Sequence, residues 1–250
     1  MQHPRNILAE TRRVLEGVNR AVDSDRRLAH HTDDVRIELL PDRTLRVSGE
    51  VDTLGIKRRL LQRAEYAPGV EGIADDLRVR PVEPMSDDAI RMRLADALQA
   101  EPVLTETALR QWKDGQLASL REATAARDAI SIAVEDAVVT LEGHVCSLER
   151  ARLAGVLAWW IAGTRDVHNQ LEVHPHPDDS DEEVQEAVSH VLAKEPALDA
   201  TRIRVSVEEH LVELWGLVPD PDQRMTAERD AWFVLGVDDV RNRLEVLPVA

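Results

Sequence analysis

Cys146 is the one thiol of the chain, and together with His144 it is the pair best suited to nucleophilic chemistry. A cysteine nucleophile needs a base held against it and a further group that orients the base. Two residues that lie two apart on a strand share a face, but the sequence shows no third group that would orient His144. We therefore expect no catalytic residues, and the alternative is an enzyme that depends on Cys146.

A second cluster of polar side chains could ligate a metal ion: His174, His176, Asp178 and Asp179 lie within six residues. The prolines that alternate with the two histidines hinder both imidazoles from turning toward one ion. Neither a second cysteine nor a helical His-x-x-x-His pair completes a ligand set. We expect a polar linker here, without a metal site and without a cofactor.

Lys57, Arg58, Arg59 and Arg63 form a basic cluster that suits an anionic lipid headgroup. Residues 1–63 carry 13 Lys and Arg against 10 Asp and Glu, whereas the whole chain carries 31 against 47 and has a net charge of −16. A chain this acidic repels nucleic acid and anionic membranes as a whole, so no nucleic-acid partner is expected. The other interpretation of the cluster is a solvated helix face.

A repeated structural unit positions these residues. Three glycines mark the repeat, and each is followed by another glycine 20 residues later: Gly49 and Gly69, Gly143 and Gly163, Gly216 and Gly236. Before each first glycine, apolar residues alternate with polar ones in two short runs separated by a polar turn, which predicts a β-hairpin. After it, apolar residues recur with helical spacing, and a third alternating run follows. One small fold therefore occurs three times.

Another amphipathic helix precedes each hairpin, so each unit is predicted to be α-β-β-α-β and the fold class is α+β. The predicted domains are residues 1–82, 83–175 and 176–250, joined by short proline-rich linkers. The second unit has roughly 21 extra residues, at about 105–127. Their composition predicts a helical insertion of one or two short helices, broken near Asp114-Gly115.

The second and third units carry the clearest motif. A strand ending in G-x-V, at Gly143 to Val145 and Gly216 to Val218, precedes a V-x-N-x-L-x-V run, at Val167 to Val173 and Val240 to Val246. This pattern resembles the BON domain, the bacterial OsmY and nodulation module. The first unit matches less fully, because Asp75 replaces the asparagine. The resemblance covers nearly the whole chain apart from the insertion. It implies a non-enzymatic module associated with phospholipid or envelope binding, osmotic stress response, or attachment of partner proteins and small ligands.

The second helix of the second unit is apolar on nearly every side. Besides the face expected to pack on the sheet, it has a second stripe with i, i+3, i+4, i+7 spacing. This outer stripe consists of Leu153, Val156, Leu157 and Trp160. Either the insertion, with Trp112, or a neighbouring unit covers it, or it stays open as a slot for an apolar ligand or as a self-association face. Trp159 and Trp232 share one repeat position and are predicted to pack between units or to anchor a ligand.

Composition bears on the compartment. One cysteine excludes an internal disulfide, and the N-terminal residues lack the apolar core of a signal peptide, so a cytoplasmic location is predicted. No apolar run reaches the roughly 20 residues of a membrane span. We interpret the chain as a binding or scaffold protein that recognises a protein partner, itself, or a phospholipid or apolar ligand. The alternative is a structural homo-oligomer subunit that assembles through the second-unit helix.

Overall fold

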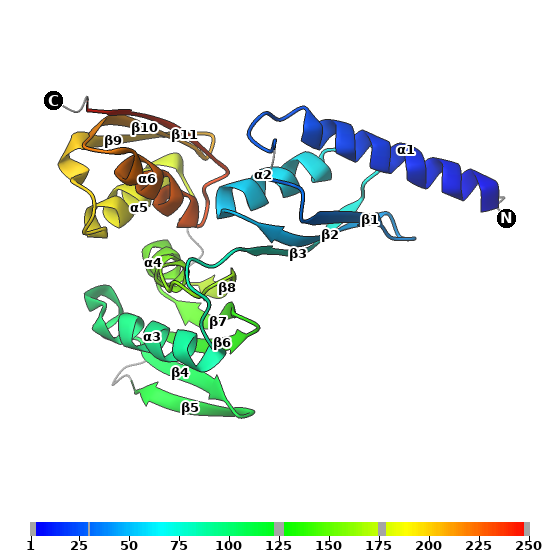
Figure 1. Cartoon of the computed structure of the whole chain (residues 1–250). Coiled ribbons are helices and arrows are strands. Elements are labelled where there is room, and N and C mark those ends of the chain that lie inside the picture. The colour runs from blue at the N-terminus through cyan, green and yellow to red at the C-terminus, as the bar shows by residue number, and fades with distance from the viewer. Residues whose placement is uncertain (1–3, 30, 123–127, 175–178, 248–250) are drawn as a thin grey trace. The chain divides into compact units, whose positions relative to one another are not determined.

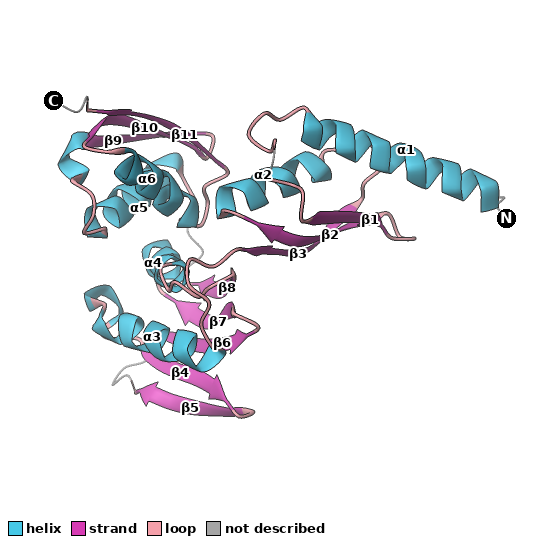
Figure 2. Ribbon diagram, in the orientation of Figure 1, coloured by secondary structure: helices cyan, strands magenta, loops and turns pink. Residues whose placement is uncertain are grey.

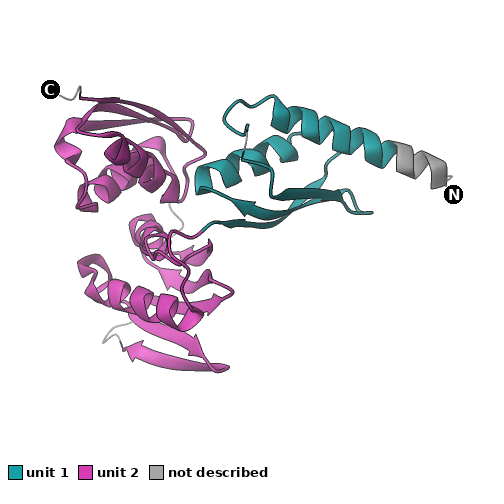
Figure 3. Cartoon of the chain, viewed as in Figure 1, with its two compact units in different colours: residues 1–80 teal, residues 81–250 magenta. Residues whose placement is uncertain are grey.

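The computed structural model describes residues 4–29, 31–122, 128–174 and 179–247 (Figure 1). The chain forms two compact units, Met1–Arg80 and Pro81–Ala250 (Figure 3). Three separate sheets, each covered by helices, make up the two units (Figure 2). The predicted α+β class and the repetition of one unit are therefore confirmed.

The first compact unit is a single α-β-β-α-β module. Its elements are α1 (Pro4–Asp23), β1 (Val35–Leu39), β2 (Thr44–Val51), α2 (Leu54–Glu65) and β3 (Gly72–Val79). β1 and β2 form an antiparallel hairpin, and β3 returns parallel to β2 after crossing over through α2. The middle strand β2 therefore pairs with both neighbours, and the helices cover one face of the sheet (Figure 1).

The second compact unit contains two modules of the same kind. The second module comprises α3 (Asp87–Ala100), β4 (Ala108–Lys113), β5 (Gln116–Arg121), β6 (Ala129–Glu135), β7 (Val138–Val145), α4 (Leu148–Trp159) and β8 (Asp166–Val173). The third module comprises α5 (Asp181–Lys194), β9 (Ile203–Glu208), β10 (Leu211–Val218), α6 (Pro221–Phe233) and β11 (Asp239–Val246). Their sheets have the orders β5-β4-β6-β7-β8 and β11-β10-β9.

The insertion of the second module is a β-hairpin, so the prediction of one or two short helices is wrong. Asp114 and Gly115, which were expected to break a helix, have φ values of 52° and 74° and form the two-residue turn between β4 and β5. Two adjacent residues with positive φ are typical of a type I′ turn, whose backbone twist matches that of the two strands in a hairpin. β4 then pairs parallel to β6, and this extends the sheet to five strands.

Side-chain caps fix where the helices of the modules begin. The caps expected from the sequence are present: Ser180 Oγ accepts from Glu183 N at 3.3 Å, and Asp220 Oδ1 accepts from Gln223 N at 2.8 Å. The helices α2, α3 and α4 begin with equivalent caps, at Thr53, Ser86 and Ser147. Each cap satisfies one of the amide groups that a helix leaves unpaired at its start.

Candidate functional site

The outer stripe of α4 lies inside the second compact unit. Val156 is completely buried and belongs to the hydrophobic cluster of the third module. Leu153 and Leu157 are 4% and 8% exposed and belong to the cluster of the second module. Trp160 packs against both clusters. The third module therefore covers Val156, and the two modules share a continuous apolar boundary, which we call the joint: the contact of α4 with α5, α6 and the residues flanking them.

Charged side chains fasten the joint. Arg152 is only 2% exposed, and its Nε donates to the carbonyl oxygen of Leu235 at 2.8 Å. Its Nη2 is bonded to the carboxylate of Asp179. A second link joins Lys194 Nζ of α5 to Glu101 Oε2, at the end of α3, over 3.0 Å. Buried guanidinium groups hold partners in a fixed geometry because their donors are directional.

Aromatic side chains complete the joint. Trp159 stacks on Phe233 at the end of α6, with ring centroids 5.4 Å apart and ring planes 4° from parallel. The remaining predicted tryptophans lie elsewhere: Trp232 is 4% exposed in the core of the third module, and Trp112 is 42% exposed on β4. Two of the four tryptophans singled out in the sequence, Trp159 and Trp160, therefore meet at the joint.

Asp230 is a buried acid of the joint, and in the repeat it occupies the position of Leu157 in the second module. Its side chain is completely buried on α6. Trp160 Nε1 and Arg229 Nε donate to its Oδ1 over 3.3 and 3.2 Å, while its Oδ2 is buried without a hydrogen-bond partner. Burial raises the pKa of Asp230 to about 6, although the Arg229 guanidinium acts in the opposite direction. The pKa rises because a carboxylate that is removed from water is less stable than the neutral carboxyl group.

Replacing Asp230 by asparagine is expected to remove a pH dependence of stability. Because the pKa of Asp230 is about 6 in the fold and about 3.9 in an unfolded chain, the folded state binds more protons between these values. The free energy of unfolding therefore falls as the pH rises from about 4 to about 6, by about 2–3 kcal/mol. Asparagine cannot ionise and keeps the Oδ1 acceptor. Urea unfolding from pH 4 to 8 should show the variant gaining stability over the wild type across this window, and a difference that does not change with pH would contradict the argument.

Lys57 and Arg63 of the basic cluster are paired within the first unit. Lys57 is 4% exposed, and its Nζ lies 2.9 Å from Asp75 Oδ2 and donates to Leu77 O at 2.9 Å. Arg63 Nε lies 3.2 Å from Asp25 Oδ2. Arg58 and Arg59 also have interaction partners. The structure thus places Lys57 in the core, away from any surface that could meet a headgroup.

Lys57 and Asp75 replace a clamp that the other modules build with asparagine. Asn169 Nδ2 donates to Ala151 O at 2.7 Å, and Asn242 Nδ2 donates to Arg224 O at 2.7 Å, so each ties its last strand to the first turns of the helix. An aspartate cannot donate to such a carbonyl group. In the first module the lysine side chain reaches back to the carboxylate instead, and the same two elements remain tied.

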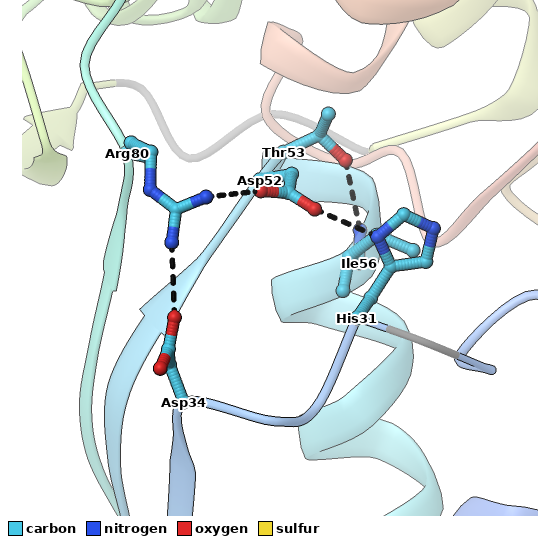
Figure 4. Close-up of polar contacts among 6 residues, drawn as sticks. All are labelled: His31, Asp34, Asp52, Thr53, Ile56 and Arg80. Carbon is cyan, nitrogen blue, oxygen red and sulfur yellow. Dashed lines mark hydrogen bonds and ion pairs between the residues drawn. The ribbon is translucent and has the colours of Figure 1, made fainter.

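An exposed ion-pair network lies at one end of the first unit's sheet (Figure 4). Arg80, which follows β3, donates to Asp52 Oδ1 at 2.7 Å and to Asp34 Oδ2 at 3.1 Å. The other oxygen of Asp52 lies 2.8 Å from His31 Nδ1. Asp52 directly precedes Thr53, the cap of α2. The network ties strand ends to a helix start, and such exposed pairs contribute little stability, about 0–1 kcal/mol.

The residues considered for chemistry do not converge in the structure. Cys146 and His144 are both exposed. His174 Nε2 lies 3.3 Å from Glu172 Oε2, and His176 and Asp178 lie outside the described residues. Asp179 is bonded to Arg152 at the joint. Within the part of the chain that the structure describes, no group of three His, Cys, Asp or Glu side chains could hold a metal ion.

Sequence reasoning missed the outer face of the third sheet. Trp215 and Leu217 lie on β10, where Val212 and Leu214 point into the core, and they are 43% and 45% exposed. The period-two pattern of a strand already assigns them to the opposite face from the buried residues. The signal was therefore present in the alternation that predicted the strand.

A groove of about 510 Å³ opens beside Arg152, between the start of α4 and α5. Its walls include Glu149 from the second module and Glu183, Glu186 and His190 from the third. His190 Nδ1 lies 3.5 Å from Glu149 Oε1 across it. Because each module supplies one wall, the groove exists only where the joint is formed.

Solved structures offer only a remote likeness. The C-terminal domain of CdsD, the structural protein of the type III secretion system of Chlamydia trachomatis, is 16% identical and aligns over 94% of this chain and 97% of that chain, with a TM-score of 0.25. A second CdsD structure has the same identity and TM-score and covers 94% and 92%. A TM-score of 0.25 is too low to support an inference about the fold or the function of this chain. No curated protein matches the chain, and within the described residues no helix is long and apolar enough to cross a membrane.

A family model gives the decisive comparison. The BON domain model matches residues 114–175 and 180–248, which together exceed half of the 250 residues. The two matched segments include the hairpin, the crossover helix and the last strand of the second and third modules. The first unit repeats their three-strand order. This chain therefore belongs to the BON domain family.

Proposed function

We propose that this chain is a non-enzymatic scaffold that binds protein, with BON modules at residues 1–82, 83–175 and 176–250. The observation that carries the proposal is the joint. The helix face that distinguishes the second module, with Val156 at its centre, is used to fasten the third module. Two modules held in one body present their loops, strands and intervening groove in a fixed arrangement, and preorganised surfaces lose less entropy when a partner binds.

The same contacts argue against the lipid interpretation. A lipid chain would need the outer stripe of α4, where Val156 is completely buried. A headgroup would need the basic cluster, where Lys57 is paired with Asp75 and Arg63 with Asp25. The net charge of −16 opposes approach to an anionic surface. Protein recognition in a reducing compartment, without a nucleic-acid partner, is the function that these features favour.

The proposal is consistent with how the chain uses its buried charges. Arg152, Lys57 and Glu101 each bridge two elements of the fold. BON domains are generally non-catalytic binding modules. Charged groups committed to structural bridges are poorly placed to change partners during a reaction, because breaking a buried pair costs about 3–5 kcal/mol.

Nitrogen-15 relaxation of the full chain tests the scaffold. We expect amides of the second and third modules to report one common tumbling time. Distinct tumbling times for the two modules would contradict a single body. Flotation with anionic and with neutral vesicles tests the lipid alternative on the same protein. We expect no flotation with either, and flotation with anionic vesicles that Arg63→Gln weakens would overturn the choice of protein over lipid.

A further inference from the structure

The third module has a surface that the other two modules lack. Its sheet is covered by helices on one face, while Trp215 and Leu217 project from the other and stay almost half exposed. The register of the repeat, counted from the first glycine of each unit, gives the corresponding residues of the other modules. These are Ser48 and Glu50 in the first and Glu142 and His144 in the second. An exposed tryptophan and leucine side by side on one strand are a feature of interaction surfaces.

Arginines flank the tryptophan on both sides. Trp215 is directly opposite Arg204 where β10 pairs with β9, and directly opposite Arg243 where β10 pairs with β11. The Arg243 guanidinium lies 5.0 Å from the indole centroid, and its Nη2 donates to Glu213 Oε1 at 3.3 Å. A cation held over an aromatic face restrains the ring. The indole is thus held in place before any partner arrives, which lowers the entropy lost on binding.

Arg204 is a cation without a counter-charge. Among the residues that the structure describes, none makes a hydrogen bond or an ion pair with its side chain, which is exposed. The surrounding face is nearly balanced, because the outward positions of the three strands hold three arginines against four carboxylates. The other members are Arg241, Arg243, Glu208, Glu213, Asp239 and Glu245. The formal charge of this face is thus −1, on a chain whose net charge is −16.

We propose that this face binds the same face of a second copy of the chain. A surface that carries cations and carboxylates in nearly equal numbers around an apolar centre offers both kinds of charge to an identical surface. Under a twofold axis, each meeting of an arginine with a glutamate occurs twice. Arg204 then pairs with a carboxylate of the second copy, while Trp215 and Leu217 of both copies are buried between the two sheets, as in aligned sheet packing.

Charge also decides against other occupants. A nucleic acid or an anionic vesicle would face four carboxylates on this surface and an acidic chain around it. Two copies repel each other through their net charge, and this repulsion is weakest where the local charge is close to zero. Their association should therefore strengthen, or stay constant, as salt screens the repulsion, whereas binding of a polyanion weakens with salt.

Sedimentation velocity of the full chain at several protein and salt concentrations tests the proposal. We expect a reversible dimer. The double variant Trp215→Ser, Leu217→Glu has the side chains that the first module carries at the same register, so it should fold and should weaken the association at least about tenfold. The single variant Arg204→Glu leaves the apolar pair intact and should weaken the dimer through its charge alone.

Met225→Ser is the matched control, because Met225 is 62% exposed on α6, away from this sheet face. It should leave the dimer unchanged. A chain that is monomeric at every concentration and salt would overturn the proposal, and so would a dimer that persists in both the double variant and Arg204→Glu. Binding of oligothymidylate or of anionic vesicles that the double variant abolishes would assign the face to a polyanion instead. Neither result depends on whether the second and third modules tumble together, so this proposal and the scaffold can fail separately.

Discussion

Replacing Gly49 by alanine is expected to lower the free energy of unfolding of the first unit by about 4 kcal/mol or more. Gly49 has a φ of 122°, and a Cβ there would lie 2.0 Å from the carbonyl oxygen of Asp34. The obstacle is backbone, which cannot rotate away as a side chain can. Gly143 and Gly216 repeat this geometry, with φ values of 126° and 135° and carbonyl oxygens at 2.1 and 2.0 Å. The glycine of the middle strand is thus required by close approach as well as by backbone conformation.

Hydrogen exchange measured by mass spectrometry on peptides from residues 1–80 resolves the first unit from the rest of the chain. Protection of β1 and β2 should fall strongly in Gly49→Ala. Gly17→Ala is the matched control, because Gly17 lies within α1 and a Cβ there meets nothing within 4 Å. Alanine is the better helix former, so this variant should gain about 0.5–1 kcal/mol. Equal protection in both variants would refute the role assigned to Gly49.

Replacing Val156 by aspartate is expected to open the joint and to lower the free energy of unfolding of the second compact unit by about 3–5 kcal/mol. The new carboxylate would be buried in the hydrophobic cluster of the third module, or would have to stay protonated at a similar cost. Arg152, one turn earlier on α4, is already bonded to Leu235 O and to Asp179. Trp159 and Trp160 pack at the joint. Opening it should therefore shift tryptophan emission to the red at denaturant concentrations that leave the wild type folded.

Leu117→Asp provides the comparison for Val156→Asp. It introduces the same charge into the same module, but Leu117 is 43% exposed on β5. Leu117 lies opposite Trp112 in the hairpin, so the folded-state emission of that tryptophan is measured first. The cost of the substitution should stay below about 1 kcal/mol, and the urea concentration at which the emission shifts should stay close to that of the wild type. If both variants unfold at the wild-type urea concentration, the joint does not stabilise the pair of modules.

Local sequence patterns were sufficient for the hairpins and helices of the modules. Alternation and helical spacing located them because one face of each element is buried against a partner in its own module. The helix caps at Ser180 and Asp220 were predictable for a related reason, since a cap is decided by residues three positions apart. The insertion was predicted wrongly because Asp114-Gly115 serves equally as a helix break and as a hairpin turn. What selected the strand was pairing of β4 with β6, a contact between distant parts of the chain.

The sequence by itself determined the repeat, the order of elements in each module and the family, because these depend on spacing within about 80 residues that recurs three times. It also showed that α4 has a second apolar face, which the sheet of its own module does not cover. Only the tertiary structure decided what meets that face, and what becomes of the charges around it. Burial of Val156 and the bridge from Arg152 to Leu235 arise between elements of different modules. The raised pKa of Asp230 follows from its burial in the folded chain. The sequence of a hydrophobic stripe predicts that the stripe is buried, but not against what, because burial of apolar surface is not directional. The partner that covers it is selected by shape and charge in three dimensions.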